Sequence, residues 1–524
     1  MAGERGRAVI LLLFFQVPLL QAARILTVCF LGGSHYLLMD EISRILHNNG
    51  HEVRMFLQFG DGMLPGDLLL QSPYPVSTYS LGEKNQQEFR EFFINGQKKF
   101  LKGRYHLSDF LQLMELLSNQ CNITLHQSDI LHFLKEEKYD LAIIDTFNPC
   151  SFLVAEKLGV PFIAFFPGIF MNAGRVGAHG PLSYVPLFQA KLTDRMDFFG
   201  RLKNTVMYLG SNMVDDMIEA PFQKVIDEHF PAGSRPSIAD LHVKAELWIY
   251  NVDFTIDFPR PLPPNIQCIG GLLAGPAKPV SADLEDFIAE SGDAGFIVVS
   301  LGSMISSLPI LEFVKEMNDG FAKIRQKVIW RYKRSHWPKE VDVAPNVRLV
   351  DWLSQNDLLG QPKVRLLVTH GGMNSLMEAV YHGVPVVGIP LFGDQYENLI
   401  RIKAKNMGTF IPPEEMEAES FANSMREVIE NSRYKTSAMK LSVILRSRPF
   451  PPERQLLGWV EHILQSGGGS HLRPYSYQQP WYQRHLLDVI LFISTIVAAV
   501  VYLTVKVCTV LLSFLPPNRK QKLN

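Results

Sequence analysis

The stretch from Leu367 to Ala379, LVTHGGMNSLMEA, has the pattern of a buried strand that runs into a helix with almost no loop between them. The corner between strand and helix holds His370, Gly371, Gly372, Asn374 and Ser375. The free N–H groups and the dipole of a helix N-terminus favour an anion. The glycines would let the backbone approach it closely, and His370 could hydrogen-bond to it or carry positive charge. A phosphate is the best candidate, and an elaborate helix cap is the alternative.

Residues on both sides of this corner could bind other parts of a ligand whose phosphate lies there. Glu378 lies one turn into the expected helix and could bind a ribose diol. Asp394 and Gln395 follow the next expected strand, where adjacent acid and amide groups could bind neighbouring sugar hydroxyls. Upstream, the Trp352 ring could stack on a nucleobase, and the Gln355 side chain could hydrogen-bond to the edge of that nucleobase. Taken singly, Trp352 is more often a core residue and Asp394 a helix cap.

A candidate acid–base pair stands in the first half of the chain. His35 follows the first expected strand at the entry of a helix, and Asp145 follows another strand at the equivalent place. A neutral histidine is suited to take a proton from an acceptor hydroxyl near pH 7. It works best when a carboxylate holds its other ring nitrogen. On its own, His35 would more often be a cap or core histidine.

Short apolar strands alternate with helices in two series, which is typical of parallel sheets covered on both faces. The strands are expected at residues 24–31, 52–57, 141–145, 161–166, 296–301, 328–332, 347–350, 365–369 and 384–389. A proline- and glycine-rich segment, residues 258–279, lies between the series and is the best linker candidate. We therefore expect an α/β protein with two doubly wound domains facing each other across a cleft. Ligands bind such sheets at the carboxyl ends of the strands.

Both ends of the chain carry apolar segments. Residues 1–23 have the layout of a cleaved secretory signal, for which a buried N-terminal strand is the alternative. Residues 486–515 are long enough to span ~30 Å of hydrocarbon, although a buried core helix fits the same pattern. Lysines and an arginine follow in residues 516–524. The positive-inside rule then makes this tail cytosolic and everything before the span lumenal.

Two short signals concern the compartment. Lys520 and Lys522 resemble the dilysine retrieval signal of endoplasmic reticulum membrane proteins, with simple stop-transfer charges as the alternative. Asn122 begins an Asn-Ile-Thr sequon, which is usable only in a lumenal domain. We expect a type I single-pass protein of the endoplasmic reticulum membrane with its large domains in the lumen.

Composition excludes several other classes. The formal net charge is −1, so nothing indicates a nucleic-acid partner. The 5 cysteines show neither metal-like spacing nor a disulfide framework, although one bridge remains possible. An Asp-x-Asp motif does not occur, so we expect no divalent metal on a diphosphate and no cofactor beyond the donor itself.

The spacing Trp352-x2-Gln355, His370-Gly-Gly-x-Asn-Ser-x-x-Glu378 and Pro390-x3-Asp394-Gln395-x2-Asn398 resembles the signature of the UDP-glycosyltransferases. The resemblance covers nearly the whole chain. Stretches such as GGSHYLLMDEISRIL and KAELWIYNVDF look most like the third vertebrate family of these enzymes, with the glucuronosyltransferases and the ceramide galactosyltransferase more distant. The resemblance implies a GT-B fold that binds the donor in the C-terminal domain and the acceptor in the N-terminal domain.

The resemblance also implies roles for individual residues. Contacts to the UDP-sugar fall to Ser303, Trp352, Gln355, His370, Gly372, Asn374, Ser375, Glu378, Phe392, Asp394 and Gln395. His35 is implied as the general base and Asp145 as its partner. Ser354 stands where relatives usually have proline, which loosens the Trp352 loop but removes no contact.

These expectations give one layout and one function. The domains are a signal peptide (1–23), an acceptor domain (24–265), a UDP-sugar domain (280–450), a helical segment (451–480), a membrane helix (486–515) and a cytosolic tail (516–524). We expect inverting, metal-independent transfer from a UDP-sugar to a hydroxyl of a small lipophilic acceptor. Glucose, xylose or N-acetylglucosamine is favoured over glucuronate, because Asp394 would repel a carboxylate and the donor signature lacks a cation. Arg260 of the linker could still reach the carboxylate of a glucuronate donor. Phe392 would lie beside the sugar and leave little room for an N-acetyl group.

Three alternatives stay open. The chain could be a UDP-glucuronosyltransferase, a sugar epimerase or phosphorylase on a similar fold, or a non-catalytic UDP-sugar-binding membrane protein. The presence of both His35 and Asp145 argues against the last of these. The sequence leaves open which acceptor is used and whether the chain forms a homo- or hetero-oligomer.

Overall fold

The computed structural model describes residues 22–59, 72–171, 174–178, 180–305 and 307–514. It divides into two compact units, residues 1–472 and residues 473–524. The expected signal segment lies outside the described residues except for its last two positions. The expected cytosolic tail with Lys520 and Lys522 also lies outside them.

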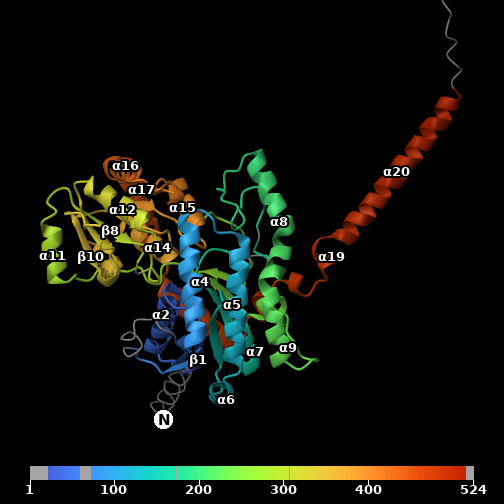
Figure 1. Ribbon diagram of the computed structural model, residues 1–524. Helices are drawn as coiled ribbons and strands as arrows, with labels where there is room; N and C mark the ends of the chain where they lie inside the picture. The colour runs from blue at the N-terminus through green and yellow to red at the C-terminus, as the bar shows by residue number, and fades with distance from the viewer. Residues whose placement is uncertain (1–21, 60–71, 172–173, 179, 306, 515–524) are drawn as a thin grey trace, which may run out of the picture. The chain divides into compact units, whose positions relative to one another are not determined.

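The first unit contains two parallel sheets (Figure 1). The first sheet has seven strands in the order β3 (Val76–Ser80), β2 (Glu52–Phe59), β1 (Arg24–Cys29), β4 (Leu141–Asp145), β5 (Phe162–Phe166), β6 (Leu247–Tyr250) and β7 (Ile266–Cys268). Its helices are α2 (Ser34–Asn48), α4 (Glu83–Leu101), α5 (Leu107–Leu125), α6 (Ser128–Glu136), α7 (Cys150–Leu158), α8 (Phe198–Glu219), α9 (Gln223–His229) and α10 (Ile238–Lys244).

The second sheet has six strands in the order β10 (Val347–Val350), β9 (Lys327–Arg331), β8 (Phe296–Ser300), β11 (Val364–Thr369), β12 (Val386–Gly388) and β13 (Gly408–Phe410). Its helices are α11 (Ala282–Ala289), α12 (Leu311–Ala322), α13 (Gln355–Leu359), α14 (Met373–His382), α15 (Gln395–Ala404), α16 (Ala418–Glu430) and α17 (Ser432–Arg446). Two parallel Rossmann-like sheets confirm the expected α/β class.

Burial explains in part which strands were predictable, although β6 (Leu247–Tyr250), which was not among the expected strands, is also buried at every residue. Strands β4, β5 and β8 are buried at every residue, so they read in the sequence as short uninterrupted apolar runs. The edge strand β3, VSTYS, buries only Tyr79 and gives no such signal. Strand β13 has three residues, too few for a period to show.

Strand order determines where ligands can bind. In the first sheet the order reverses between β1 and β4, and in the second between β8 and β11. Crevices form at the carboxyl ends of the strands at such switch points. His35 follows β1 and Asp145 ends β4, and the loops with Ser303 and His370 follow β8 and β11. Each sheet therefore places its candidate residues at its own switch point.

The chain returns to the first sheet before it leaves the unit. Helix α18 (Pro452–Ser466) buries Leu456, Val460 and Ile463 in a core shared with β1 and α2. A disulfide joins Cys121 of α5 to Cys150 of α7, which is the single bridge that the sequence left open.

The second unit holds α19 (Trp481–Arg484) and α20 (Leu487–Ser513). Helix α20 has 27 residues and is long and apolar enough to cross a membrane. At 1.5 Å per residue it measures about 40 Å.

Candidate active site

His35 and Asp145 form a close pair at the first switch point. His35 Nδ1 lies 2.6 Å from Asp145 Oδ2. The other carboxylate oxygen, Oδ1, accepts a hydrogen bond from the Phe147 N–H at 3.0 Å. Asp145 is buried and the His35 side chain is 18% exposed, so the carboxylate is fixed while the imidazole remains reachable. With Nδ1 facing the carboxylate, Nε2 is the nitrogen available to a substrate.

The surroundings of His35 set its charge. Burial alone lowers the pKa of His35, but the charge and hydrogen bond of Asp145, with a further effect from Asp394, raise it above 6.5 overall. A base must be neutral to accept a proton. Catalysis through His35 therefore requires a pH above this raised pKa.

The loop before His35 lies against the second sheet's domain. Gly33 has a φ of +65°, and a Cβ there would lie 2.9 Å from Ser303 Oγ and 2.5 Å from a side-chain carbon of Met304. A larger residue would push the two loops apart. Gly33 thus brings the base and the β8 loop together, a contact that sequence spacing does not reveal.

The corner that contains His370 has the geometry of an anion site. Gly372 is the N-cap of α14, and no side chain hydrogen-bonds across this end of the helix. A Cβ on Gly302 or on Gly372 would lie within 2.7 Å of the His370 ring, so both glycines allow close backbone approach. Burial, with a smaller effect of Arg331, lowers the pKa of His370 to about 4. With no anion beside it, His370 is therefore neutral at pH 7 and acts as a hydrogen-bonding group.

The cation at this corner is Arg331, which sequence reasoning missed. Its guanidinium carbon lies 4.8 Å from the centre of the Trp352 ring. Its terminal nitrogens donate to the carbonyl oxygens of Gly302 at 2.5 Å and Ser303 at 3.2 Å. Arg331 ends β9, the neighbour of β8, so its place at the carboxyl edge of the sheet was the signal that could have found it.

The residues expected to contact the nucleoside are Trp352, Gln355 and Glu378. The Trp352 side chain is 51% exposed, which is unusual for a tryptophan and leaves its ring accessible. Gln355 donates from its amide nitrogen to Glu378 at 2.5 Å. Burial raises the pKa of Glu378 to about 7. The two side chains predicted to contact base and ribose are thus already paired with each other.

Two residues expected to contact the donor, Asn374 at the diphosphate and Asp394 at the sugar, face the first domain. Asn374 Oδ1 accepts a hydrogen bond from Asn251 Nδ2 at 2.9 Å, which joins α14 to the end of β6. A Cβ on Gly168, after β5, would lie 3.1 Å from Asp394 Oδ2. Burial raises the pKa of Asp394, and His35 is among the charges that act on it. Asp394 and His35 therefore belong to one site.

The side-chain oxygen of Gln395 shapes the loop before its own helix. Its side-chain oxygen accepts hydrogen bonds from the N–H groups of Leu391 at 2.8 Å and Phe392 at 2.9 Å. The residue is 3% exposed. Only its amide nitrogen is left to approach a sugar, while its oxygen shapes the loop that carries Phe392.

Phe392 sits among aromatic rings from both domains. Its ring centre lies 5.9 Å from that of Phe93 and 5.7 Å from that of Phe100, both on α4. The His370 ring is 6.4 Å away on the other side. The side chain therefore stands between the acceptor domain and the phosphate corner.

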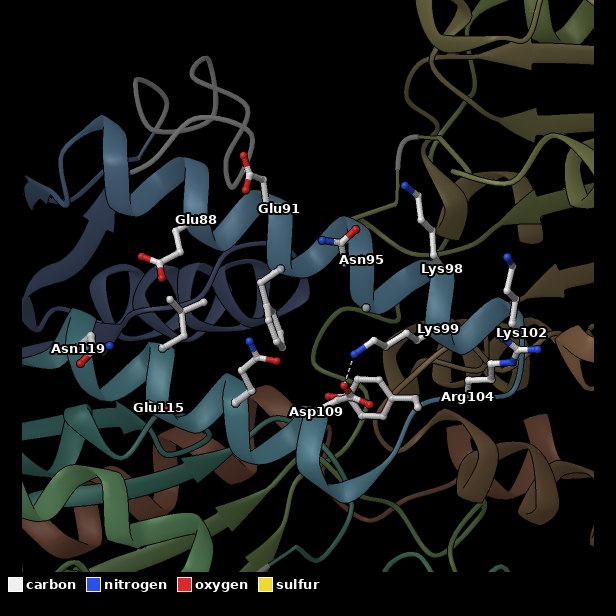
Figure 2. Close-up of a pocket in the computed structure, with 15 residues that line it drawn as sticks. Glu88, Glu91, Asn95, Lys98, Lys99, Lys102, Arg104, Asp109, Glu115 and Asn119 are labelled. Atoms are coloured by element: carbon white, nitrogen blue, oxygen red, sulfur yellow. Dashed lines mark hydrogen bonds and ion pairs between the residues drawn. The ribbon is translucent and has the colours of Figure 1, made fainter.

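A separate cavity of about 860 Å³ lies between α4 and α5 (Figure 2). Glu88, Glu91 and Glu115 line one end, and Lys98 and Lys102 lie toward the other. None of the predicted site residues lines it. Its charged walls do not suit a lipophilic acceptor, and we do not assign the active site to it.

Comparison with known proteins gives the family. The family model for UDP-glucoronosyl and UDP-glucosyl transferases matches residues 23–522. The chain belongs to the UDP-glycosyltransferase family. It is 56% identical over 524 residues to UDP-glucuronosyltransferase 3A1 of Xenopus laevis and 46% identical over 525 residues to UDP-glucuronosyltransferase 3A2 of Homo sapiens, covering 100% of each chain.

More distant relatives are consistent with this family. The human 2-hydroxyacylsphingosine 1-beta-galactosyltransferase is 32% identical over 94% of this chain and 89% of its own. Among solved structures, the calicheamicin glycosyltransferase CalG4 matches with a TM-score of 0.59 over 84% of this chain and 98% of that chain. At 17% identity that match shows the shared GT-B fold alone.

One group in the described part of this UDP-glycosyltransferase could hold a metal ion, and it lies outside the predicted site. His126, Glu228 and His229 offer ligand atoms within 4.8 Å of one another at the ends of α5 and α9. His229 Nε2 lies 2.5 Å from Asn122 Oδ1, the residue of the sequon. None of these side chains is among the residues predicted to contact the donor.

Proposed function

We propose that this UDP-glycosyltransferase transfers a sugar from a UDP-sugar to a hydroxyl of a small lipophilic acceptor, with inversion and without a metal ion. The observation that carries the proposal is the His35–Asp145 pair, 2.6 Å apart, in the same site as Asp394 of the other domain. A histidine oriented by a buried carboxylate is the arrangement that general-base activation of a hydroxyl needs.

The proposed reaction is a single displacement. The acceptor oxygen gives its proton to His35 Nε2 and forms a bond to the anomeric carbon, on the face opposite UDP. The bond between that carbon and the diphosphate oxygen breaks, and its electron pair leaves with UDP. An α-linked donor sugar thereby becomes a β-glycoside. Asp145 stabilises the imidazolium that forms.

The donor contacts follow from the corners described above. We assign Trp352 and Gln355 to the base and Glu378 to the ribose, and we assign Asp394 and the amide nitrogen of Gln395 to the sugar. The diphosphate contacts are Ser303, His370, Gly372, Asn374 and Ser375. The N-terminus of α14 and nearby Arg331 would stabilise the charge on departing UDP.

A neutral donor sugar is the version we favour. Arg260, the linker cation that could have met a glucuronate carboxylate, is 4% exposed, and its guanidinium lies 4.0 Å from Asp257 and against the Phe170 ring. Asp394 would repel a second carboxylate. Several relatives are nevertheless named UDP-glucuronosyltransferases, so UDP-glucuronate is the second candidate donor.

The donor choice is tested at Phe392. Wild type should prefer UDP-glucose or UDP-xylose over UDP-N-acetylglucosamine, with UDP-glucuronate poorest, because Phe392 fills the space that an N-acetyl group needs. Phe392→Asn should shift the preference toward the N-acetylated donor, measured as ratios of kcat/KM with one acceptor. Phe392→Leu is the control, since it frees space without adding an amide. Unchanged ratios in both variants, or a wild type that works best with UDP-glucuronate, would contradict this assignment.

Metal independence gives a second test. Activity should persist after exhaustive chelation, because the donor charge is met by α14 and side-chain donors. His126→Ala serves as a control, since it removes a ligand of the one candidate metal group in the described chain. Loss of activity on chelation that Mg²⁺ or Mn²⁺ restores would refute the proposal.

We propose the endoplasmic reticulum membrane as the location, with α20 as the span and residues 22–472 in the lumen. The Cys121–Cys150 disulfide supports an oxidising compartment. Protease added to sealed microsomes should remove only the tail beyond about residue 515, and Asn122 should carry a glycan. Digestion of the bulk of the chain in intact microsomes would overturn this topology.

Turnover itself separates the proposal from its rivals. UDP release should require both donor and acceptor and should match glycoside formed. A non-catalytic binder would bind UDP-sugar without release, and an epimerase would change the sugar without releasing UDP. A panel of phenols and steroids is the first acceptor set, because the site borders Phe147 and the aromatic face of α4.

A further inference from the structure

Three side chains that can bind a metal ion meet where α5 and α9 end. His126 directly follows α5, and Glu228 and His229 are the last two residues of α9. The two helices contact each other in the first domain (Figure 1). One ligand atom from each side chain lies within 4.8 Å of the other two. Two histidines and one glutamate are an established set of zinc ligands, with a fourth position left open. We call these three residues the α5–α9 cluster.

Asn122 orients both histidines of the cluster. Its main-chain carbonyl oxygen lies 2.8 Å from His126 Nδ1, and its side-chain oxygen lies 2.5 Å from His229 Nε2. These oxygens can only accept, so each of the two ring nitrogens carries a proton and the other nitrogen of each ring keeps its lone pair. Metal-binding histidines are typically held in this way. Asn122 is itself fixed, because its neighbour Cys121 is joined to Cys150 of α7.

The charges within the cluster suit a cation. His126 Nε2 lies 3.2 Å from Glu228 Oε1. A lone pair and a carboxylate oxygen repel each other at this distance unless a proton or a metal ion lies between them. Burial, His126 and Lys157 lower the pKa of His229, and Glu228 opposes them. His229 is therefore neutral at pH 7, which is the state that binds a metal ion.

The geometry can close around an ion. Zinc ligands lie about 2.0–2.2 Å from the ion and therefore about 3.3–3.5 Å from one another in a tetrahedron. The 3.2 Å between His126 Nε2 and Glu228 Oε1 is already close to this spacing. These two side chains are 56% and 51% exposed, so they can turn toward His229 without disturbing a packed core.

We propose that the side chains of His126, Glu228 and His229 bind a zinc ion that ties the end of α5 to the end of α9. Asn122 is the positioning residue of this site, and water fills the fourth place around the ion. The glycan expected on Asn122 is compatible with the ion. It would be attached to Nδ2, whereas the two oxygens of Asn122 are the atoms that face the histidines.

This site is separate from the proposed chemistry. Lys157, in the last turn of α7, donates to the His229 carbonyl oxygen at 2.7 Å, and α7 leads into β5, which begins at Phe162. The cluster therefore borders the amino ends of the strands, whereas His35 and Asp145 lie at the carboxyl ends. The ion would stabilise the fold and take no part in sugar transfer, so the inference does not depend on the proposed function.

Zinc binding to the full chain tests the proposal. The detergent-solubilised protein is freed of metal and titrated with Zn²⁺ against a chromogenic chelator, and its melting temperature is measured with and without Zn²⁺. Wild type should bind one more Zn²⁺ per chain than His126→Ala or His229→Ala, and Zn²⁺ should raise its melting temperature by more. His132→Ala removes an exposed histidine of α6 and should match wild type. The pair His462 and His471, 2.9 Å apart, is present in every variant, so any zinc that it binds cancels.

Two variants of Asn122 test the positioning role. Asn122→Asp and Asn122→Ala both remove the glycan, but only the aspartate keeps a side-chain oxygen for His229. Zinc affinity should be about 10–100-fold lower in Asn122→Ala than in Asn122→Asp. Equal zinc stoichiometry and affinity in wild type, His126→Ala and His229→Ala would overturn the site. A site that persists with equal affinity in the two Asn122 variants would overturn the role given to Asn122.

Discussion

Replacing His35 with alanine should lower kcat by about 10²–10⁴-fold while the affinity for UDP stays near wild type. The base belongs to the first domain, after β1, whereas the predicted UDP contacts follow β8 and β11 of the second. Within the part of the chain that the structure describes, the His35 side chain hydrogen-bonds to Asp145 alone, so truncation should leave the donor half intact. The measurement is glycoside formation at saturating donor, with UDP affinity determined by calorimetry on the same preparation.

Asp145→Asn is the companion variant, and its pH profile tells more than its rate. The amide keeps the shape but loses the charge that raises the pKa of His35. Wild-type kcat/KM should fall as the pH drops through this raised pKa, because the protonated ring cannot act as a base. In Asp145→Asn the acid limb should move to lower pH while the maximum rate also drops. A His35→Ala enzyme that keeps more than about a hundredth of the wild-type rate would exclude His35 as the main base.

Replacing Asp257 with alanine should destabilise the first unit by about 3–5 kcal/mol, because it leaves buried charge without a partner. The Asp257 side chain is 0% exposed, and its carboxylate accepts a hydrogen bond from Arg401 Nε at 2.6 Å. A terminal guanidinium nitrogen of Arg260 lies 4.0 Å from the same carboxylate. Arg401 also pairs with Glu397 on the same helix, at 3.3 Å. Removing the aspartate would leave two buried guanidinium groups with a single carboxylate.

The position of this network adds a functional effect. Asp257 precedes the linker, whereas Arg401 and Glu397 lie on α15, whose N-cap is Asp394. Loss of the Asp257–Arg401 ion pair should therefore raise KM for the UDP-sugar and also lower the melting temperature. The exposed pair Glu290–Lys327 gives the control, since Glu290→Gln should change neither. Equal melting temperatures for wild type and Asp257→Ala would show that the domains are held together by other contacts.

The sign of the pH effect at Asp257 follows from its environment. Burial raises the pKa of Asp257, but Arg401 and Arg260 more than offset this and hold it below 3.8. A carboxyl group with a depressed pKa stabilises the fold above its unfolded pKa and loses that contribution as the pH falls. The difference in the free energy of unfolding between wild type and Asp257→Ala should therefore be at its full value at pH 7 and should shrink only in strong acid.

Much of the donor half could be predicted because its residues are close in sequence. His370, Gly372 and Glu378 lie within one strand–helix corner, so local spacing alone describes them. The pair His35 and Asp145 is separated by 110 positions, yet both follow strands at one switch point, which made the pairing an inference from fold.

What the sequence could not give depends on contacts between distant segments. Arg331 reaches Trp352 and the β8 loop only because β9 neighbours β8. The Asn251–Asn374 hydrogen bond and the approach of Gly33 to Ser303 cross from one domain to the other. The neutral state of His370 follows from its burial, which no spacing encodes.

The central claim is that His35-activated oxygen attacks the anomeric carbon on the face opposite UDP. The stereochemistry of the product tests it most directly. Wild-type enzyme, an α-linked UDP-sugar and one accepted phenol or steroid are combined, and the anomeric configuration of the glycoside is read from its proton coupling by NMR. The account predicts a β-glycoside with one UDP released per glycoside formed. An α-glycoside would contradict it, because a single displacement on the face opposite UDP inverts the anomeric centre, whereas retention requires front-face entry or two successive displacements.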